Sequence, residues 1–125
     1  MSINNLVVLG TGLIGGSVAK SAREAGVVNN VIVLNRQIET SNRAVTLGIA
    51  DTAKDYSHLA EVCGSLGQGD FVLVAVPIYT YARIFERLAD LLPAGVILTD
   101  VGSTKAEVVN AAREHWQGDL SCFVP

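Results

Sequence analysis

The 125-residue sequence predicts a doubly wound α/β fold, in which helices cover both faces of a parallel sheet. Short apolar runs rich in β-branched residues recur along the chain, each bounded by Gly, Asn, Asp or Pro. They do not alternate with polar residues, which is typical of strands buried on both faces. Segments with helical spacing separate them, and the expected strand order is 3-2-1-4-5-6. The apolar runs are 6–9, 31–34, 71–76, 96–98 and, more weakly, 120–124.

The spacing of apolar residues predicts the helices between these strands. The clearest stripe runs over 81–92 at i, i+3, i+4 and i+7, with Pro77 placed to begin the helix and Pro93 just past its end. The pattern is weakest over 49–69, where we expect a short strand near 50–52. The expected helices are 14–25, 39–48, 57–66, 81–92 and one that starts near 104.

The composition indicates one globular domain and excludes several classes of protein. Half of the residues are hydrophobic and 17% are charged, which argues against disorder, and 125 residues leave little room for a second domain. The net charge is −3 without a basic block, so we expect no nucleic-acid partner. No apolar run is long enough to span a bilayer, and the first residues lack signal-peptide features. Cys63 and Cys122 match neither a metal site nor a disulfide framework, so we expect no metal and a cytoplasmic protein.

A glycine-rich loop follows the first predicted strand. Gly10, Gly12 and Gly15 form a G-x-G-x-x-G that opens a helix, as in the Rossmann dinucleotide-binding fold. The first glycine permits the tight turn, the second lets a pyrophosphate approach the backbone, and the third lets helix and strand pack closely. The helix N-terminus then holds the phosphates. The alternative is a tight strand-to-helix turn that binds no ligand.

The end of the second strand predicts which dinucleotide is preferred. Sites selective for NAD carry an acid there, but this chain has Asn35 followed by Arg36. A guanidinium can pair with a 2′-phosphate and stack on adenine, so we expect NADP(H) to be preferred over NAD(H), with Ser41 and Arg43 adding to the pocket. The alternative is that Arg36 is a solvated surface residue and Glu39 replaces the acid.

Two more strand ends are candidates for ligand contact, because doubly wound sheets bind ligands at the carboxyl ends of their strands. Pro77 ends the run Ala-Val-Pro and can pack against a nicotinamide ring, or it can simply begin a helix. The polar run 99–105 leads into another helix N-terminus. There Ser103 can present its hydroxyl to a ligand or cap the helix, and Lys105 can hold an anion or a neighbouring carboxylate.

Four segments in this order resemble the amino-terminal domain of prephenate/arogenate dehydrogenases, the enzymes of tyrosine biosynthesis. They are 10–17 (GTGLIGGS), 47–49 (LGI), 75–77 (AVP) and 99–105 (TDVGSTK). The resemblance covers essentially the whole chain, and the first and last segments together are fairly specific. It implies oxidation of prephenate or arogenate at the ring carbon bearing the hydroxyl, by hydride transfer to NADP+ or NAD+ with loss of CO2, driven by formation of an aromatic ring.

The same resemblance implies roles for individual residues. Ser103 is similar to the serine that binds the hydroxyl of the substrate ring and orients the catalytic histidine. The complete protein is expected to be a homodimer that binds a small-molecule substrate. The residues implied to contact the cofactor are Gly10, Thr11, Gly12, Leu13, Ile14, Gly15, Asn35, Arg36, Val76, Pro77 and Val101.

The chain also departs from the family pattern. The family histidine follows a Phe-Val-Pro-like segment, and this chain ends at 123–125 with those three residues. We therefore expect 1–125 to be the dinucleotide-binding domain alone, without the catalytic histidine or the helical domain for substrate binding and dimerisation, and to bind cofactor without turnover. Neither His58 nor His115 is expected to replace the missing base. The alternatives are the cofactor domain of a β-hydroxyacid dehydrogenase or pyrroline-5-carboxylate reductase, or a non-enzymatic NAD(P)-sensing module.

Overall fold

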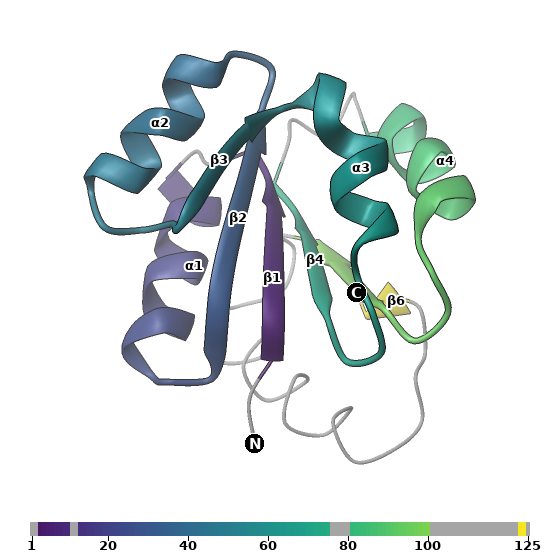
Figure 1. The fold of residues 1–125 in the computed structure, drawn as a ribbon, viewed down its shortest axis with the longest axis horizontal. Helices are drawn as coiled ribbons and strands as arrows, with labels where there is room; N and C mark the ends of the chain where they lie inside the picture. The colour runs from purple at the N-terminus through teal and green to yellow at the C-terminus, as the bar shows by residue number, and fades with distance from the viewer. Residues whose placement is uncertain (1–2, 11–12, 76–80, 101–122, 125) are drawn as a thin grey trace.

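The computed structural model describes residues 3–10, 13–75, 81–100 and 123–124, in which strands and helices alternate (Figure 1). Three strand–helix pairs form the first half, and the second half begins at β4. In chain order the elements are β1 (Ile3–Leu9), α1 (Leu13–Glu24), β2 (Val28–Asn35), α2 (Ile38–Thr46), β3 (Thr52–Asp55), the 3₁₀ helix η1 (Tyr56–His58), α3 (Leu59–Gly64), β4 (Phe71–Val74), α4 (Tyr81–Leu91), β5 (Ile97–Asp100) and β6 (Phe123–Val124).

The strands form one parallel sheet in the order β3-β2-β1-β4-β5-β6, which confirms the predicted doubly wound topology. β1 lies at the centre and pairs with β2 on one side and β4 on the other, with Leu9 opposite both Leu34 and Val74. The chain therefore reverses its direction of winding between β1 and β4. In such sheets the crevice at this point is where ligands bind.

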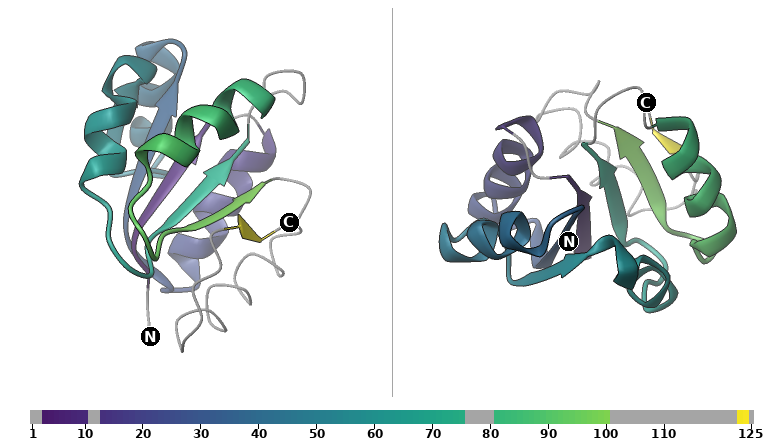
Figure 2. Two further views of the ribbon diagram at one scale, coloured as in Figure 1. Left: turned by 90° about the vertical axis from the view of Figure 1, so that its right-hand side faces the viewer. Right: turned by 90° about the horizontal axis from the view of Figure 1, so that it is seen from above.

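Helices cover the two faces of the sheet (Figures 1 and 2), and an apolar layer lies between the helices and each face. Val8 belongs to the layer that α1 and α2 cover, whereas its neighbours Val7 and Leu9 belong to the layer under α3 and α4. All three side chains are fully buried. This alternation explains why the strands contain continuous apolar runs: both faces of each central strand are inside the protein.

The strand in the weakly patterned stretch begins later than predicted. We expected it near 50–52, but β3 covers Thr52–Asp55. The reason is a polar turn at Asp51, whose Oδ2 accepts a hydrogen bond from Val31 N at 2.9 Å while its own N–H donates to Val31 O at 2.9 Å. This turn anchors the chain to β2 before β3 starts. Asp51 also forms an ion pair with Arg23 of α1 at 2.9 Å, so polar contacts that apolar periodicity does not reveal lie at the start of β3.

The other boundaries agree with the sequence to within a few residues. α2 and α4 match the expected helices, and the expected helix 57–66 divides into η1 and α3. β4 ends at Val74, two residues before the end of its apolar run. The segment that carries Pro77 and the helix expected from 104 lie outside the described residues. No helix in the described ranges has the length and apolar character needed to cross a membrane.

A buried carboxylate organises the amino edge of the sheet, opposite the candidate site. Asp70 is 3% exposed, and its carboxylate accepts hydrogen bonds from Asn5 N at 3.0 Å, Asn5 Nδ2 at 3.2 Å and Gly67 N at 2.8 Å. Asn30 of β2 donates in turn to Asn5 Oδ1 at 3.0 Å. The network joins β1, β2 and the loop before β4, so its polar groups serve the structure of the sheet.

Candidate functional site

The candidate site lies at the carboxyl edge of the sheet, where β1 and β4 end side by side. Gly10 follows β1 and donates its N–H to Leu34 O at 2.8 Å, while Ala75 follows β4 and donates to Leu9 O at 2.8 Å. Gly10 has φ +84°, a conformation that residues with a Cβ rarely adopt. The chain thus turns sharply off the central strand at the point where the winding reverses.

Gly15 brings the first turn of α1 directly against this turn. A Cβ added there would lie 2.7 Å from Gly10 O, 2.8 Å from Ala75 Cβ and 3.5 Å from Val8 Cγ1. The first two distances are shorter than real Cβ contacts allow, so only glycine fits. This is the close packing of helix on strand that the third glycine of the motif was predicted to permit.

The amino end of α1 suits an anion such as a pyrophosphate. The helix is 12 residues long and carries no acidic residue in its first turn. Its first backbone N–H groups have no partner within the helix, and the helix dipole favours negative charge there. Leu13 and Ile14, predicted to contact the cofactor, begin α1, whereas Thr11 and Gly12 lie outside the described residues. The described part of the loop therefore fits a dinucleotide.

Asn35, in the predicted ribose-selecting position, is the last residue of β2 and is 8% exposed. Its Nδ2 donates to Ser41 Oγ at 2.9 Å, and that hydroxyl donates to Lys54 O at 2.8 Å. Ser41 is fully buried in α2, so the expectation that it adds to the pocket around Arg36 is wrong. Its hydroxyl is already committed to two partners because α2 packs this residue between the ends of β2 and β3.

Arg36 lies in the bend between β2 and α2 and is exposed, as are Glu39 and Arg43 on α2. Arg36 directly follows the end of β2, and a residue in this position can reach the ribose of a bound dinucleotide. Glu39, the alternative acid, lies in the first turn of α2. The structure therefore leaves both predicted cations accessible to an anion, and it leaves the competing carboxylate accessible too.

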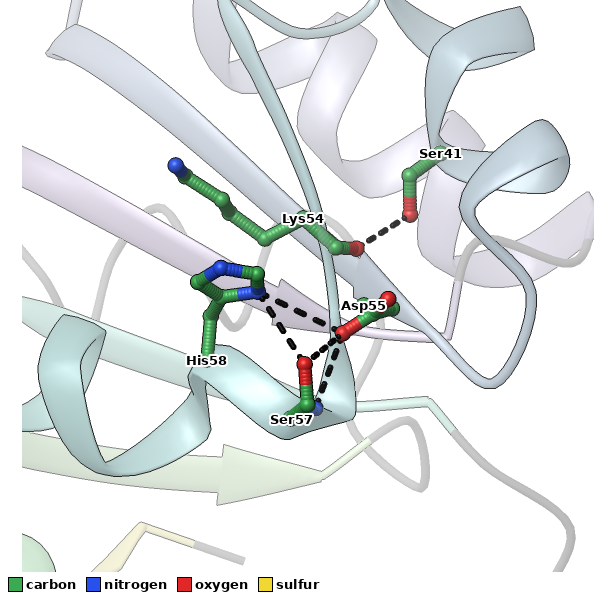
Figure 3. A network of polar contacts seen from close by, with 5 residues as sticks. All are labelled: Ser41, Lys54, Asp55, Ser57 and His58. Carbon is green, nitrogen blue, oxygen red and sulfur yellow. Dashed lines mark hydrogen bonds and ion pairs between the residues drawn. The ribbon is translucent and has the colours of Figure 1, made fainter.

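A polar cluster at the end of β3 was missed by the sequence reasoning (Figure 3). Asp55 is the register partner of Asn35, and its carboxylate accepts hydrogen bonds from the backbone N–H and the hydroxyl of Ser57. His58 Nδ1 lies 3.3 Å from Asp55 Oδ1. The bonds from Ser57, with a smaller contribution from His58, lower the pKa of the Asp55 carboxyl. Correct placement of β3 would have revealed the cluster, because a strand predicted over 50–52 leaves Asp55 beyond the end of that strand.

The remaining candidates divide between structural residues and residues that the structure does not describe. His58 is turned toward Asp55 at the surface, and Cys63 is a fully buried residue of α3. Val76, Pro77, Val101 and Ser103 lie outside the described residues, as do Lys105, His115 and Cys122. Among the described residues there is no group of His, Cys, Asp and Glu arranged to hold a metal ion.

Comparison with known proteins finds prephenate dehydrogenases among the chains similar to this one. A prephenate dehydrogenase of Lactococcus lactis is 28% identical over 123 residues, which is 98% of this chain and 33% of that protein. One of Bacillus subtilis is 28% identical over 110 residues, or 87% of this chain and 28% of that protein. The chain thus spans about a third of the length of these curated relatives.

Solved structures give the same result. The prephenate dehydrogenase of Aquifex aeolicus, in complex with hydroxyphenyl propionate and NAD+, matches with a TM-score of 0.68 and 28% identity, over 80% of this chain and 34% of that chain. The arogenate dehydrogenase of Synechocystis matches with a TM-score of 0.65 and 28% identity, over 91% and 38%.

The family model described as "Prephenate dehydrogenase, nucleotide-binding domain" matches residues 18–125, which is most of the chain. The match begins within α1, after Gly10 and Gly15. The close packing at Gly15 is therefore evidence in addition to the family model. The strand order and the glycine turn at the centre of the sheet agree with this match. The chain belongs to the family of prephenate dehydrogenase nucleotide-binding domains.

Proposed function

We propose that this chain binds NADP+ or NAD+ for an enzyme that oxidises and decarboxylates prephenate or arogenate. The observation that carries the proposal is the close packing of Gly15 against Gly10 and Ala75. This packing places the N-terminus of α1 at the switch point of the sheet. The relatives named as prephenate and arogenate dehydrogenases support the substrate class. Two cysteines without a disulfide framework are compatible with the reducing cytoplasm, where tyrosine biosynthesis is expected.

The residues of the chain divide the work of holding the cofactor. The loop of Gly10, Gly12 and Gly15 would lie against the pyrophosphate, and the first N–H groups of α1 would donate to it. When bound, the nicotinamide supplies a hydride acceptor. Val76, Pro77 and Val101, which follow β4 and β5 in the sequence, would lie by the nicotinamide half.

The polar run that follows β5 in the sequence would lie on the substrate side of the site. We propose that Ser103 binds the hydroxyl of the substrate ring. The relatives named as prephenate and arogenate dehydrogenases support this substrate class. The chain spans about a third of the length of its curated relatives, so the activity of the whole enzyme is part of this proposal.

Arg36 would make NADP+ the preferred cofactor. It follows the strand end directly, and the residue in the position of the usual acid is a neutral amide already bonded to Ser41. A guanidinium beside the ribose favours a 2′-phosphate, whereas an acid in that position would bind the ribose hydroxyls and repel the phosphate.

Calorimetric titration of the chain with NADP+ and NAD+ tests the proposal, using Arg36→Ala and the control Arg87→Ala. The control removes the same charge from an exposed position on α4. We expect Arg36→Ala to weaken NADP+ binding about tenfold or more and to leave NAD+ binding within about twofold, since one charged bond to phosphate is lost. The control should change neither affinity.

Two results contradict the proposal at different levels. If the folded chain binds neither dinucleotide at millimolar concentration, the proposed cofactor site is wrong. If the wild type binds NAD+ at least tenfold more tightly than NADP+, the cofactor site stands and the assignment of Arg36 is wrong.

A further inference from the structure

Ser41 links three elements at the end of the site where the ribose would lie. Its side chain on α2 is fully buried, and its Oγ lies 2.9 Å from Asn35 Nδ2 of β2 and 2.8 Å from Lys54 O of β3 (Figure 3 shows the second bond). Residues 34 and 54 are register partners in the parallel ladder, so the two strands are adjacent at this level. One hydroxyl thus joins a helix to the ends of two strands.

The chemistry of these groups fixes the direction of each hydrogen bond. A backbone carbonyl only accepts, so Ser41 must donate its single hydroxyl hydrogen to Lys54 O. The hydroxyl can then only accept from Asn35, which requires the NH₂ group of that amide to face it. Ser41 therefore favours the orientation in which the NH₂ group of the Asn35 amide faces α2.

The same bonds hold the turn that carries Arg36. This residue lies between Asn35, the end of β2, and Gln37, the N-cap of α2. Gln37 makes no side-chain capping bond, so a side-chain cap does not fix the start of the helix. Ser41, one turn into α2, instead ties the helix to both strands.

We propose that Ser41 is a positioning residue for cofactor selection. It acts through the Asn35 amide and the turn between β2 and α2, and so sets where the Arg36 guanidinium stands relative to the ribose. It does not touch the cofactor, because its hydroxyl is enclosed and has both partners within the protein. This inference rests on the proposed NADP+ preference and extends it from an exposed residue to a buried one.

The test measures the dissociation constants of NADP+ and NAD+ for Ser41→Ala in the full chain. The matched control is Ser65→Ala, which removes a serine hydroxyl that also donates to a carbonyl, Val62 O at 2.7 Å, at the end of α3. We expect Ser41→Ala to weaken NADP+ binding about fivefold and NAD+ binding less than twofold, because only the phosphate contact depends on the turn. A loss of stability alone would weaken the binding of both cofactors equally, so the ratio of their dissociation constants separates positioning from folding.

Two further variants keep the inference testable if Ser41→Ala folds poorly. Ser41→Cys keeps the shape of the side chain, with a somewhat larger sulfur atom that is a weak donor and acceptor, and should also lower the preference for NADP+ over NAD+. If Ser41 acts through Asn35, the double variant Asn35→Ala/Ser41→Ala should bind NADP+ only slightly more weakly than the single variant Asn35→Ala.

The outcomes distinguish this inference from the proposed function. If the wild type prefers NADP+, Arg36→Ala loses the preference and both Ser41 variants keep it, then Ser41 is only structural and the inference is wrong. If the wild type shows no preference, or Arg36→Ala changes nothing, the proposed selectivity is wrong and the inference falls with it.

Discussion

At the residue scale, the candidate site depends on the absence of a Cβ atom at position 15. Gly15 has no room for a single methyl group, since the carbonyl oxygen of Gly10 and the Cβ of Ala75 occupy that space. The glycine pattern predicted this requirement from sequence spacing. It did not predict that the obstructing atom beyond the loop would come from the end of β4, because residues 15 and 75 are brought together only by the pairing of β1 with β4.

The substitution Gly15→Ala should therefore destabilise the protein. We expect a loss of about 1–3 kcal/mol in the free energy of unfolding, because the added methyl forces apart backbone and side chains that are already in contact. Urea denaturation followed by circular dichroism measures it, and cofactor affinity should fall as the turn shifts.

Gly64→Ala is the matched control for this prediction. That glycine is the last residue of α3, and a Cβ there would meet nothing within 4 Å. We expect no loss and at most a gain of about 1 kcal/mol, since alanine favours helix over glycine. Equal stability of the two variants would show that the tight contact at Gly15 is relieved at no cost.

At the scale of elements, polar groups at strand ends join several neighbouring elements in addition to the hydrogen bonds of the parallel ladder. Asp70 holds β1 and the loop before β4 at the amino edge, and its backbone carbonyl also accepts from Ile97 N of β5 at 2.8 Å. Ser41 has the corresponding position at the carboxyl edge. Apolar periodicity predicts that such strands exist, but these end contacts decide where each one starts, as the later start of β3 shows.

Replacing Asp70 with alanine should cost about 1–3 kcal/mol of stability, because it removes a buried carboxylate and leaves the partly buried N–H groups of Asn5 and Gly67 without this acceptor. Asp90→Ala, at an exposed position on α4, should change stability by less than about 0.5 kcal/mol. Chemical denaturation of both variants measures the difference. Cofactor affinity should be unchanged in the folded Asp70 variant, since the network lies at the opposite edge; a selective loss of binding would contradict that separation.

At the scale of the whole molecule, the sheet buries its central strands completely between two helical layers. Cys63 lies inside the layer under α3 and α4 and is fully buried. Burial raises the pKa of its thiol to about 11, with a smaller opposing effect from Arg87. The group is therefore protonated across the physiological range, as expected from a cysteine that fills space.

Alkylation of Cys63 should consequently report the opening of this layer. At pH 8 a thiol of pKa about 11 is only about 0.1% thiolate, and burial hinders the reagent as well. In a Cys122→Ser background, iodoacetamide should react slowly with the native protein and rapidly above the urea midpoint. NADP+ should slow the native reaction, because a ligand that binds only the folded state reduces the open population. Rapid labelling without denaturant would show that α3 opens independently.

The sequence by itself determined the strand order, the glycine turn and the family: the alternation of strand and helix patterns indicates a doubly wound sheet, and each motif consists of residues close together in the chain. Tertiary structure alone decided which polar groups meet at the carboxyl edge. Ser41 was expected to add to the cofactor pocket and is instead enclosed, while Asp55 was overlooked and lies beside Asn35. Both outcomes follow from the packing of α2 across β2 and β3 and from a register that a turn at Asp51 sets. These contacts join residues up to twenty positions apart, so no local pattern encodes them.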